Sequence, residues 1–255
     1  MEGPALQLLA ALLLLLAGVI AGWVNTLAGG GSLLTVPALM WYGLPVDVAN
    51  GTSRVAVLVQ GATAVWGFMR ADKLETRLLW PIALPSVLGA ALGAYAATLV
   101  PNRVLMPLVI ATLVIMAASM FLEPKKFAPP EGAEALDPRA QPRALAALFA
   151  AGFYGGFLQA GVGIVLLFVF ARLLRIDLVR GNGLKVAVIF AYSLVVVLIF
   201  AASARVALAS GAVLALGQMV GALLGVRFTL RMGQAAVQKV LFAVIVLLAL
   251  ALLFK

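Results

Sequence analysis

Two glycine-rich breaks interrupt the apolar segments of this sequence. The first is Gly29-Gly30-Gly31-Ser32 and the second is Gln159 to Gly163, and each precedes a short apolar segment, 32–44 or 162–174. A helix that starts after such a break carries about half a positive charge and unpaired N–H groups at its N-terminus. Glycine lets a ligand approach the backbone, although it also serves close helix packing. The pattern therefore predicts a site for a small anion.

Polar side chains gather near both breaks. Arg54 and Lys185 lie in matching places, each near the start of the helix that follows a broken segment. A base inside a membrane segment is costly, so each either attracts an anion or snorkels to the interface. Asp47 and Asp177 also match, and helix capping is preferred for both over pairing with a nearby base or titration during transport. The predicted substrate-binding residues are Asn25, Gly29, Gly30, Gly31, Ser32, Asn50, Thr52, Arg54, Gln159, Gly161, Gly163, Asn182 and Lys185.

The residue types that are missing exclude most enzymes. The chain has no cysteine and no histidine, which removes thiolate metal sites, Ser-His-Asp hydrolysis and the usual proton shuttle. We therefore expect no enzymatic activity, no metal site and no cofactor. No acidic residue falls near the middle of a predicted helix, so a buried carboxylate for proton coupling has little support.

Composition defines the setting in which these residues act. Hydrophobic residues make up 65% of the 255 residues and charged residues 11%, against about 25% charged in a soluble domain. The mean hydropathy is +1.16. The net charge of +9 lies between apolar runs, which indicates a topology signal and contact with membrane lipid rather than nucleic acid. The first run, 5–20, lacks a basic start and is interpreted as a membrane segment.

The chain divides into two halves around one polar stretch. Residues 1–122 form the first predicted transmembrane repeat, 123–142 a linker rich in proline and charge, and 143–255 the second repeat. The order of features is the same in both halves, as in many transporters. The apolar segments are 5–28, 32–44, 50–69, 77–99, 104–122, 143–158, 162–174, 182–202, 206–226 and 236–254.

The predicted fold is an all-α polytopic membrane protein with about eight main transmembrane helices. Each repeat consists of a broken or re-entrant hairpin and three transmembrane helices, and three is odd, so the second repeat is inverted. A helix of 13 residues reaches about 20 Å against a hydrocarbon core of about 30 Å, which favours re-entrant hairpins, although full crossing stays open.

The basic residues orient this topology. Hairpins place most of them on one side, which the positive-inside rule makes cytoplasmic, with both termini outside and the linker inside. Continuous crossings would scatter them over both sides. The first side receives Arg70, Lys73, Arg77, Lys125, Lys126, Arg139, Arg143, Arg172, Arg175, Arg180, Arg227 and Arg231, and the other Arg103, Arg205 and Lys255.

The two breaks and their flanks resemble the signatures of the TauE/SafE sulfite exporter family. The first-half match runs from Gly22-Trp23-Val24-Asn25 through the triple glycine to Pro37, followed by Gly43-Leu44-Pro45 and Ala49-Asn50-Gly51-Thr52; the second covers Gly152 to Gly163 and Asp177 to Asn182. The resemblance implies an inner-membrane permease for small sulfur-containing anions such as sulfite, thiosulfate or organosulfonates. Gln159 and Val162 depart from the commoner triple glycine of the second break.

We therefore expect a permease that moves a small anion, with a sulfur oxyanion or organosulfonate as the expected substrate, through a site formed by the two breaks near the midplane. The alternatives are a passive anion channel and a carrier of another small organic acid. An intramembrane enzyme and a structural scaffold fit less well, because no catalytic constellation is present and a scaffold does not explain matched breaks. The expected partners are the anion and membrane lipid, without nucleic acid, and a homodimer stays open.

Overall fold

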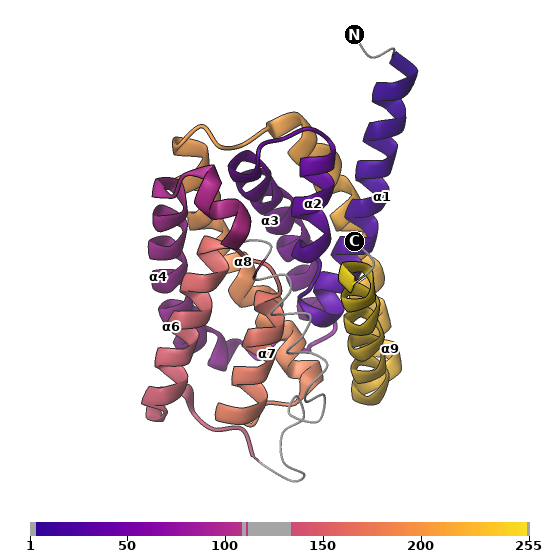
Figure 1. The fold of residues 1–255 in the computed structure, drawn as a ribbon. Coiled ribbons are helices and arrows are strands. Elements are labelled where there is room, and N and C mark those ends of the chain that lie inside the picture. Colours follow the sequence, from indigo (N-terminus) through magenta and orange to yellow (C-terminus); the bar gives the residue numbers. More distant parts are fainter. Residues whose placement is uncertain (1–3, 109–110, 112–133, 254–255) are drawn as a thin grey trace.

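The computed structural model describes the backbone of residues 4–108, 111 and 134–253, a part of the chain that contains helices and no strand. The first half contains α1 (Pro4–Ala28), α2 (Ser32–Trp41), α3 (Val46–Arg70) and α4 (Thr76–Leu99) (Figure 1). Helix α1 ends where Gly29 takes a φ of +78°. Gly43, at φ +103°, and Pro45, the N-cap residue of α3, separate α2 from α3.

The second half repeats this order. After a short 3₁₀ turn, η2 (Pro138–Ala140), come α6 (Pro142–Phe157), α7 (Val162–Leu173), α8 (Leu178–Ala202) and α9 (Leu208–Leu253). Proline opens α6 at a position where its missing N–H leaves no hydrogen bond unmade. Asp177 caps α8, because its carboxylate accepts hydrogen bonds from the backbone N–H groups of Val179 and Arg180, both at 3.0 Å. The capping predicted for Asp177 is confirmed.

Helices α3 and α8 are counterparts in the two halves. Each has 25 residues and each follows a shorter helix and a residue with positive φ, Gly43 before α3 and Arg175 before α8. Each is also followed by a residue with positive φ, Asp72 at 52° and Ala204 at 54°. The two helices pack against each other.

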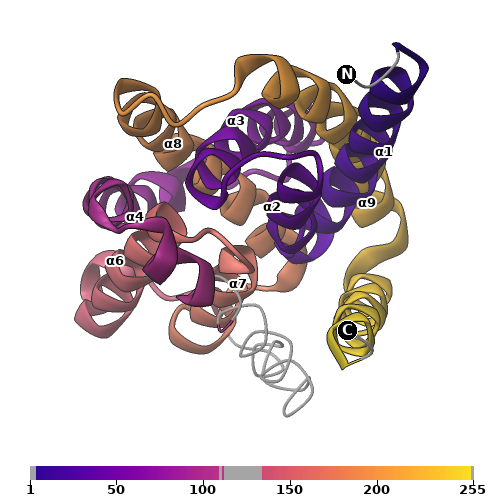
Figure 2. The same ribbon diagram turned by 45° about the horizontal axis from the view of Figure 1, so that its top comes forward.

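Two equivalent helix pairs join the two halves. Helix α1 of the first half packs on α9 of the second, and α4 of the first half packs on α6 of the second (Figures 1 and 2). The two helices of each pair lie close together because glycines of one helix face the backbone of the other. A Cβ on Gly217 would lie 2.2 Å from the Leu15 carbonyl oxygen, and one on Gly152 would lie 2.1 Å from that of Ser86. Such small-residue contacts are typical of helices packed in lipid.

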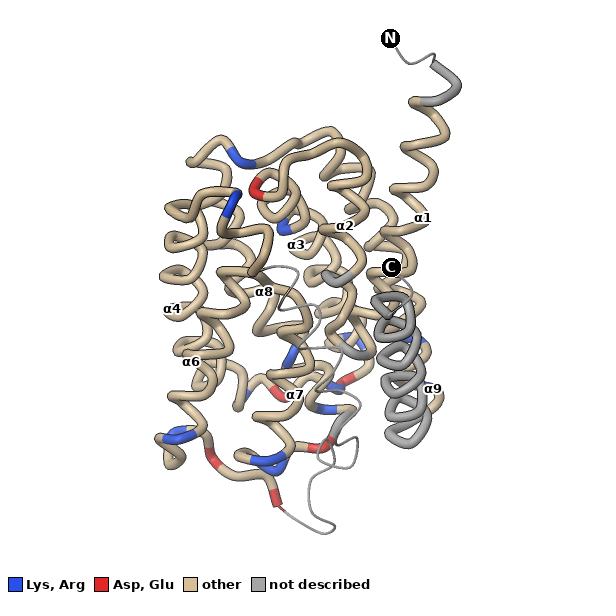
Figure 3. Tube along the Cα trace, viewed as in Figure 1, with Lys and Arg blue, Asp and Glu red and all other residues tan. Residues whose placement is uncertain are grey.

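The outer surface of the bundle is apolar, as expected in lipid. Large apolar side chains stand exposed at helical spacing on α4, for example Leu84, Leu88 and Leu92. Charged residues gather toward the two ends of the bundle (Figure 3). Among the described residues, four helical spans are long and apolar enough to cross a membrane: Gln7–Leu27, Thr76–Leu99, Val179–Ala202 and Leu208–Met232. Helix α7 is apolar but shorter.

The C-terminal helix differs from the predicted segments, and the centre of the chain is only partly described. The sequence predicts separate apolar segments at 206–226 and 236–254, whereas the backbone of α9 is helical from Leu208 to Leu253, since no proline interrupts the stretch between them. Most of the predicted segment 104–122, and residues 123–133 of the predicted linker, lie outside the described residues.

Candidate functional site

The first helix break is a sharp turn between α1 and α2. The Gly29 N–H donates to the Asn25 carbonyl at 2.8 Å, which completes the last turn of α1. The chain then reverses, and Gly31 is the N-cap residue of α2. A Cβ on Gly31 would lie 2.0 Å from the Ala21 carbonyl oxygen, so the returning chain lies directly against α1. Glycine at this position is required by space.

The second break connects α6 to α7 through two residues in the left-handed region. Gln159 has a φ of 63° and Gly161, the N-cap residue of α7, has a φ of 71°. A non-glycine residue in this region is uncommon and pays a conformational cost. The second break therefore turns in the left-handed region, as the first break does at Gly29, although its sequence is different. This accounts for its departure from a triple glycine.

The two breaks touch each other through bare backbone. A Cβ on Gly29 would lie 2.2 Å from the Gly163 Cα, and a Cβ on Gly163 would lie 2.4 Å from the Gly29 Cα. Gly163 belongs to the first turn of α7, so the N-terminus of α7 lies beside the end of α1. The structure therefore brings two of the predicted site glycines, one from each half, into direct contact.

Lys185 of α8 binds the C-terminal end of α1. Its ammonium group donates to the carbonyl oxygens of Asn25 at 3.0 Å and Thr26 at 2.9 Å, and to the Asn182 side-chain oxygen at 2.8 Å. A lysine ammonium has three hydrogens, so these three acceptors use all of them. The positive charge also lies at the negative end of the α1 dipole. Lys185 is fully buried and does not snorkel to the interface.

Arg54 of α3 binds the C-terminal end of α6 in the same manner. Its guanidinium donates to the carbonyl oxygens of Gly155 and Gly156, the latter at 3.0 Å, and to the Asn50 side-chain oxygen at 3.0 Å. Asn50 in turn donates to the Phe157 carbonyl at 3.0 Å. Arg54 is also fully buried. Each half thus supplies a base for the broken helix of the other half.

Both bases lack an acidic partner. In the part of the chain that the structure describes, the ion pairs are at the two ends of the bundle, and none includes Arg54 or Lys185. Two buried basic side chains therefore sit at the breaks, and the described oxygens that they contact are neutral. The carbonyl ends of α1 and α6 offset part of this charge, whereas the N-termini of α2 and α7 add to it. The surroundings of the breaks are electropositive.

The remaining predicted residues fall into four groups. Asn25 and Asn182 lie with Lys185, and Gly30, Gln159 and Gly161 lie buried within the breaks. Thr52 lies elsewhere, because its hydroxyl accepts a hydrogen bond from the Ala207 N–H at 2.9 Å, in the connection before α9. The side chain of Ser32 lies outside the described part of the chain.

Sequence reasoning missed Gln60, which ties α3 to the end of α1. Its side-chain oxygen accepts from the Asn25 amide at 2.7 Å, and its amide nitrogen donates to the Thr26 hydroxyl at 3.0 Å. The Thr26 hydroxyl donates onward to the Gly22 carbonyl. The available signal was an isolated amide in the apolar segment 50–69, where a polar side chain needs a partner.

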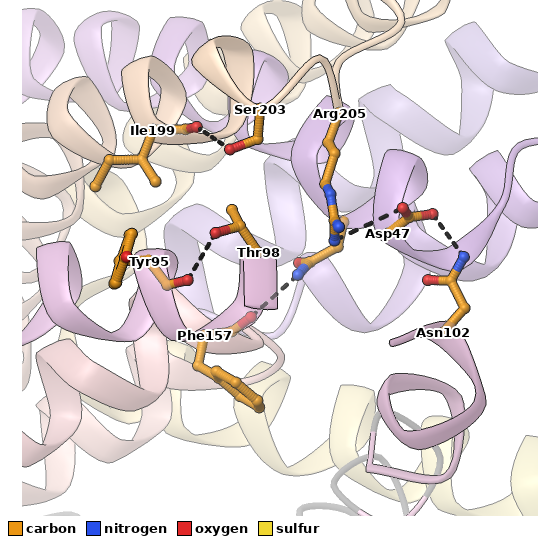
Figure 4. A network of polar contacts seen from close by, with 9 residues as sticks. Asp47, Tyr95, Thr98, Asn102, Phe157, Ile199, Ser203 and Arg205 are labelled. Atoms are coloured by element: carbon orange, nitrogen blue, oxygen red, sulfur yellow. Dashed lines mark hydrogen bonds and ion pairs between the residues drawn. The ribbon is translucent and has the colours of Figure 1, made fainter. Parts of the chain in front are cut away.

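Asp47 does not cap α3, contrary to the expectation, although it lies in the first turn of that helix. Its carboxylate instead lies 3.7 Å from the Arg205 guanidinium and accepts from the Asn102 amide at 3.0 Å (Figure 4). Pro45 takes the N-cap position, which leaves the Asp47 side chain free to reach across to the other half. The capping expected of Asp47 is therefore wrong, and the alternative, pairing with a nearby base, describes this residue.

A polar pocket marks the opposite end of the bundle. It has a volume of about 320 Å³ and is lined by Asp72, Lys73, Leu74, Glu75 and Arg180. Arg180 lies 3.8 Å from Glu75 across the connection between α3 and α4, and 3.4 Å from Asp177. Its charges are exposed and balanced, so it differs from the buried and purely basic surroundings of the breaks.

Long apolar helices with apolar outer surfaces, and broken helices that meet inside, define a polytopic integral membrane protein. The chain belongs to the sulfite exporter TauE/SafE family, whose model matches residues 14–252. The resemblance of the two glycine-rich signatures to this family is confirmed. No solved structure matches the chain.

Curated relatives carry transporter names. A "Probable membrane transporter protein ORF9" of Sinorhizobium sp is 28% identical over 253 residues, covering 99% of this chain and 95% of that protein. The "Probable membrane transporter protein YfcA" of Escherichia coli is 26% identical over 245 residues, 94% and 88% of the two chains. A "Probable membrane transporter protein" of Haemophilus influenzae is 25% identical over 228 residues, 89% and 88%. The chain is accordingly a membrane transporter of this family.

Proposed function

We propose that this transporter is a permease for a small anion, with a sulfur oxyanion or organosulfonate such as sulfite as substrate. One observation carries the proposal. Arg54 and Lys185 are fully buried at the two helix breaks, and no described carboxylate pairs with either base. A buried charge without a counter-charge is costly, so a site of this kind favours an anion.

The geometry of the breaks supports the same substrate class. The C-terminal carbonyls of α1 and α6, which would repel an anion, are covered by Lys185 and Arg54. The N-termini of α2 and α7 contribute backbone donors and partial positive charge at the same place. Glycines at the contact let the two breaks, and with them the two buried bases, come close together. Together these features suit a small acceptor-rich anion.

We further propose that the chain forms two inverted repeats, 1–122 and 143–255, in the inner membrane. The paired contacts of α1 with α9 and α4 with α6 support this architecture, as do the equal lengths of α3 and α8. In this arrangement both termini lie outside and the linker 123–142 lies in the cytoplasm. Because the chain has no cysteine, single cysteines placed at residue 73 or 205 would test the orientation by labelling with a membrane-impermeant maleimide.

Counterflow in proteoliposomes tests the function. Vesicles loaded with sulfite are challenged with thiosulfate, sulfate, acetate and a sulfonate. We expect saturable exchange among the sulfur oxyanions, and its loss in Gly161→Trp, since Gly161 has a left-handed φ at the N-cap of α7. Thermal unfolding of both proteins shows whether the variant is folded.

The outcomes separate the alternatives. Flux without saturation or exchange would indicate a passive anion channel. Exchange with acetate alone would indicate a carrier of organic acids. Wild-type exchange in a folded Gly161→Trp would remove the second break from the site, and the absence of any anion flux from folded protein would overturn the proposed function.

A further inference from the structure

Tyr192 is a fully buried residue of α8 whose hydroxyl has no hydrogen-bond partner among the described residues. An unmade hydrogen bond in a buried place costs about 1–3 kcal/mol. Phenylalanine would fill the same space without this cost. The hydroxyl is thus either an uncompensated defect or a group that binds something absent from the protein itself.

The place of this hydroxyl is the second helix break. The Tyr192 oxygen lies 2.9 Å, and the Val162 Cγ2 3.0 Å, from the position that a Cβ on Gly155 would take. Gly155 belongs to the last turn of α6 and Val162 is the first residue of α7. The hydroxyl therefore lies beside the N-terminus of α7, where the N–H groups of Val162 and Ile164 donate to the carbonyls of Gln159 and Gly161 at 3.1 Å and 3.0 Å.

Arg54 reaches the same glycine from α3. One of its terminal nitrogens donates to the Gly155 carbonyl, whereas its Nε–H has no partner in the described part of the chain. The ring of Phe200 lies 5.5 Å from the guanidinium carbon. The Tyr192 hydroxyl lies beside Gly155, and the guanidinium that donates to the Gly155 carbonyl carries the Nε–H; neither donor has an acceptor among the described residues. An anion with two acceptor oxygens would satisfy both donors and balance the charge of the guanidinium.

The position on α3 that is equivalent to Tyr192 is held by a side chain that bonds to the protein itself. Gln60 is the fifteenth residue of α3 and Tyr192 the fifteenth of α8. Both side-chain groups of Gln60 are bonded to the last turn of α1, through Asn25 and Thr26. Tyr192 faces the last turn of α6 and makes no such bond with its hydroxyl. A purely structural role would have provided a partner here as well.

We propose that the Tyr192 hydroxyl and the Arg54 Nε–H bind the transported oxyanion directly, beside the last turn of α6. The inference rests on the proposed function and adds to it the side chains that hold the substrate. Lys185 has no part in this contact, because its three hydrogens are already bonded to protein oxygens. The ligand is a small oxyanion with at least two acceptor oxygens.

Tyr192→Phe tests the inference, because it removes one oxygen and leaves the ring. Ser193→Ala is the matched control, since Ser193 is also fully buried with an unpartnered hydroxyl. Adjacent residues on a helix point about 100° apart, and Ser193 is not among the atoms nearest to the Gly155 Cβ position. Sulfite binding to the purified full chain is measured by anion-dependent thermal stabilisation, and sulfite counterflow is measured in proteoliposomes.

We expect Tyr192→Phe to weaken sulfite binding roughly 10-fold to 150-fold, the range for one hydrogen bond to a charged partner. Ser193→Ala should stay within about twofold of the wild type, and without sulfite neither variant should unfold at a lower temperature. If the wild type exchanges sulfite and the two variants bind it equally well, the hydroxyl holds only a buried water and the inference is overturned. If the folded wild type neither binds nor moves any anion of the panel, both the inference and the proposed function fail.

Discussion

Helices α3 and α8 have the same length and equivalent neighbours, yet they use their polar side chains differently. On α3, the amide nitrogens of Asn50 and Gln60 donate to the ends of α6 and α1, and their oxygens accept from Arg54 and Asn25. Their counterparts on α8 are Asn182, whose amide nitrogen has no described partner, and Tyr192, whose hydroxyl has none. The difference indicates that α3 mainly holds the breaks in place, while α8 keeps donors available for a ligand.

The two buried bases also differ from each other, but here the unpartnered donor lies on α3 and the fully bonded group on α8. Lys185 on α8 has three hydrogens and three protein acceptors, so it acts as a cap for α1. Arg54 on α3 caps α6 and still has an unpartnered Nε–H. A guanidinium can bind backbone with its outer nitrogens and a ligand with Nε, whereas a saturated ammonium cannot. The Arg54 guanidinium and the Tyr192 hydroxyl both lie at the last turn of α6, and neither Nε nor the hydroxyl has a partner among the described residues.

The largest expected effect comes from Lys185→Met. The change removes the Lys185 donor from the Thr26 carbonyl and the Asn182 oxygen and leaves the Asn25 carbonyl with the Gly29 N–H alone, so we expect a loss of about 3 kcal/mol of unfolding free energy. Unfolding in detergent without anion measures it. Lys73→Met is the matched control, because Lys73 is exposed on a connection and its loss should cost little. Wild-type stability of Lys185→Met would contradict the capping role.

The second-largest loss of stability is expected at the contact between the two breaks. Gly29→Ala places a Cβ 2.2 Å from the Gly163 Cα in a residue at φ +78°, so strain and overlap act together. We expect a loss of about 2–3 kcal/mol. Gly43→Ala is its control, since Gly43 also has a positive φ but nothing lies within 4 Å of its Cβ position. Its cost should be about 1 kcal/mol. Equal losses in a thermal unfolding comparison would mean that the overlap is relieved easily.

The contrast between α3 and α8 is sharpened by Gln60→Met and Tyr192→Phe. Gln60→Met leaves the buried Asn25 amide without an acceptor, so we expect it to lower the unfolding free energy by about 1–2 kcal/mol. Tyr192→Phe removes a group that has no protein partner and should leave stability in the absence of anion unchanged or raised. Denaturation of both variants without anion measures the two changes in unfolding free energy. Losses of equal size would show that Tyr192 has a structural partner.

The smallest effects are expected at the ends of the bundle. Asp177→Ala removes the cap of α8 and should cost about 1 kcal/mol. Asp47→Ala removes only a partly exposed ion pair and an amide contact, so we expect about 0.5 kcal/mol. Thermal unfolding of the two variants side by side measures the difference. A larger loss in Asp47→Ala would show that the contact between Asp47 and Arg205 is worth more than a helix cap.

Some of this arrangement could be predicted from the sequence. The breaks at Gly29 and Gly161 follow from glycine runs before short apolar segments, and the matched places of Arg54 and Lys185 follow from the repeated order of features. The partners of the two bases could not be predicted. The acceptors of Lys185 are backbone carbonyls about 160 residues away, and a carbonyl has no identity in a sequence pattern.

Gln60 and Tyr192 were missed for a different reason. Neither belongs to a recognisable motif, because the residues around them are mostly apolar and the glycine-rich breaks lie elsewhere in the sequence. Their equivalent positions become visible only when the helix boundaries of α3 and α8 are known. Asp47 was misjudged because Pro45 fixes the start of α3 two residues earlier.

The reciprocal capping of the broken helices sets an order of events during synthesis. The Thr26 carbonyl leaves the ribosome 159 residues before Lys185, the side chain that binds it. At about 5–20 residues per second, the end of α1 waits roughly ten to thirty seconds for its cap. Arg54 waits in turn for Gly156, 102 residues later. Neither half can complete its own break, so the nascent first half must be held in an unfinished state until the second half has entered the membrane.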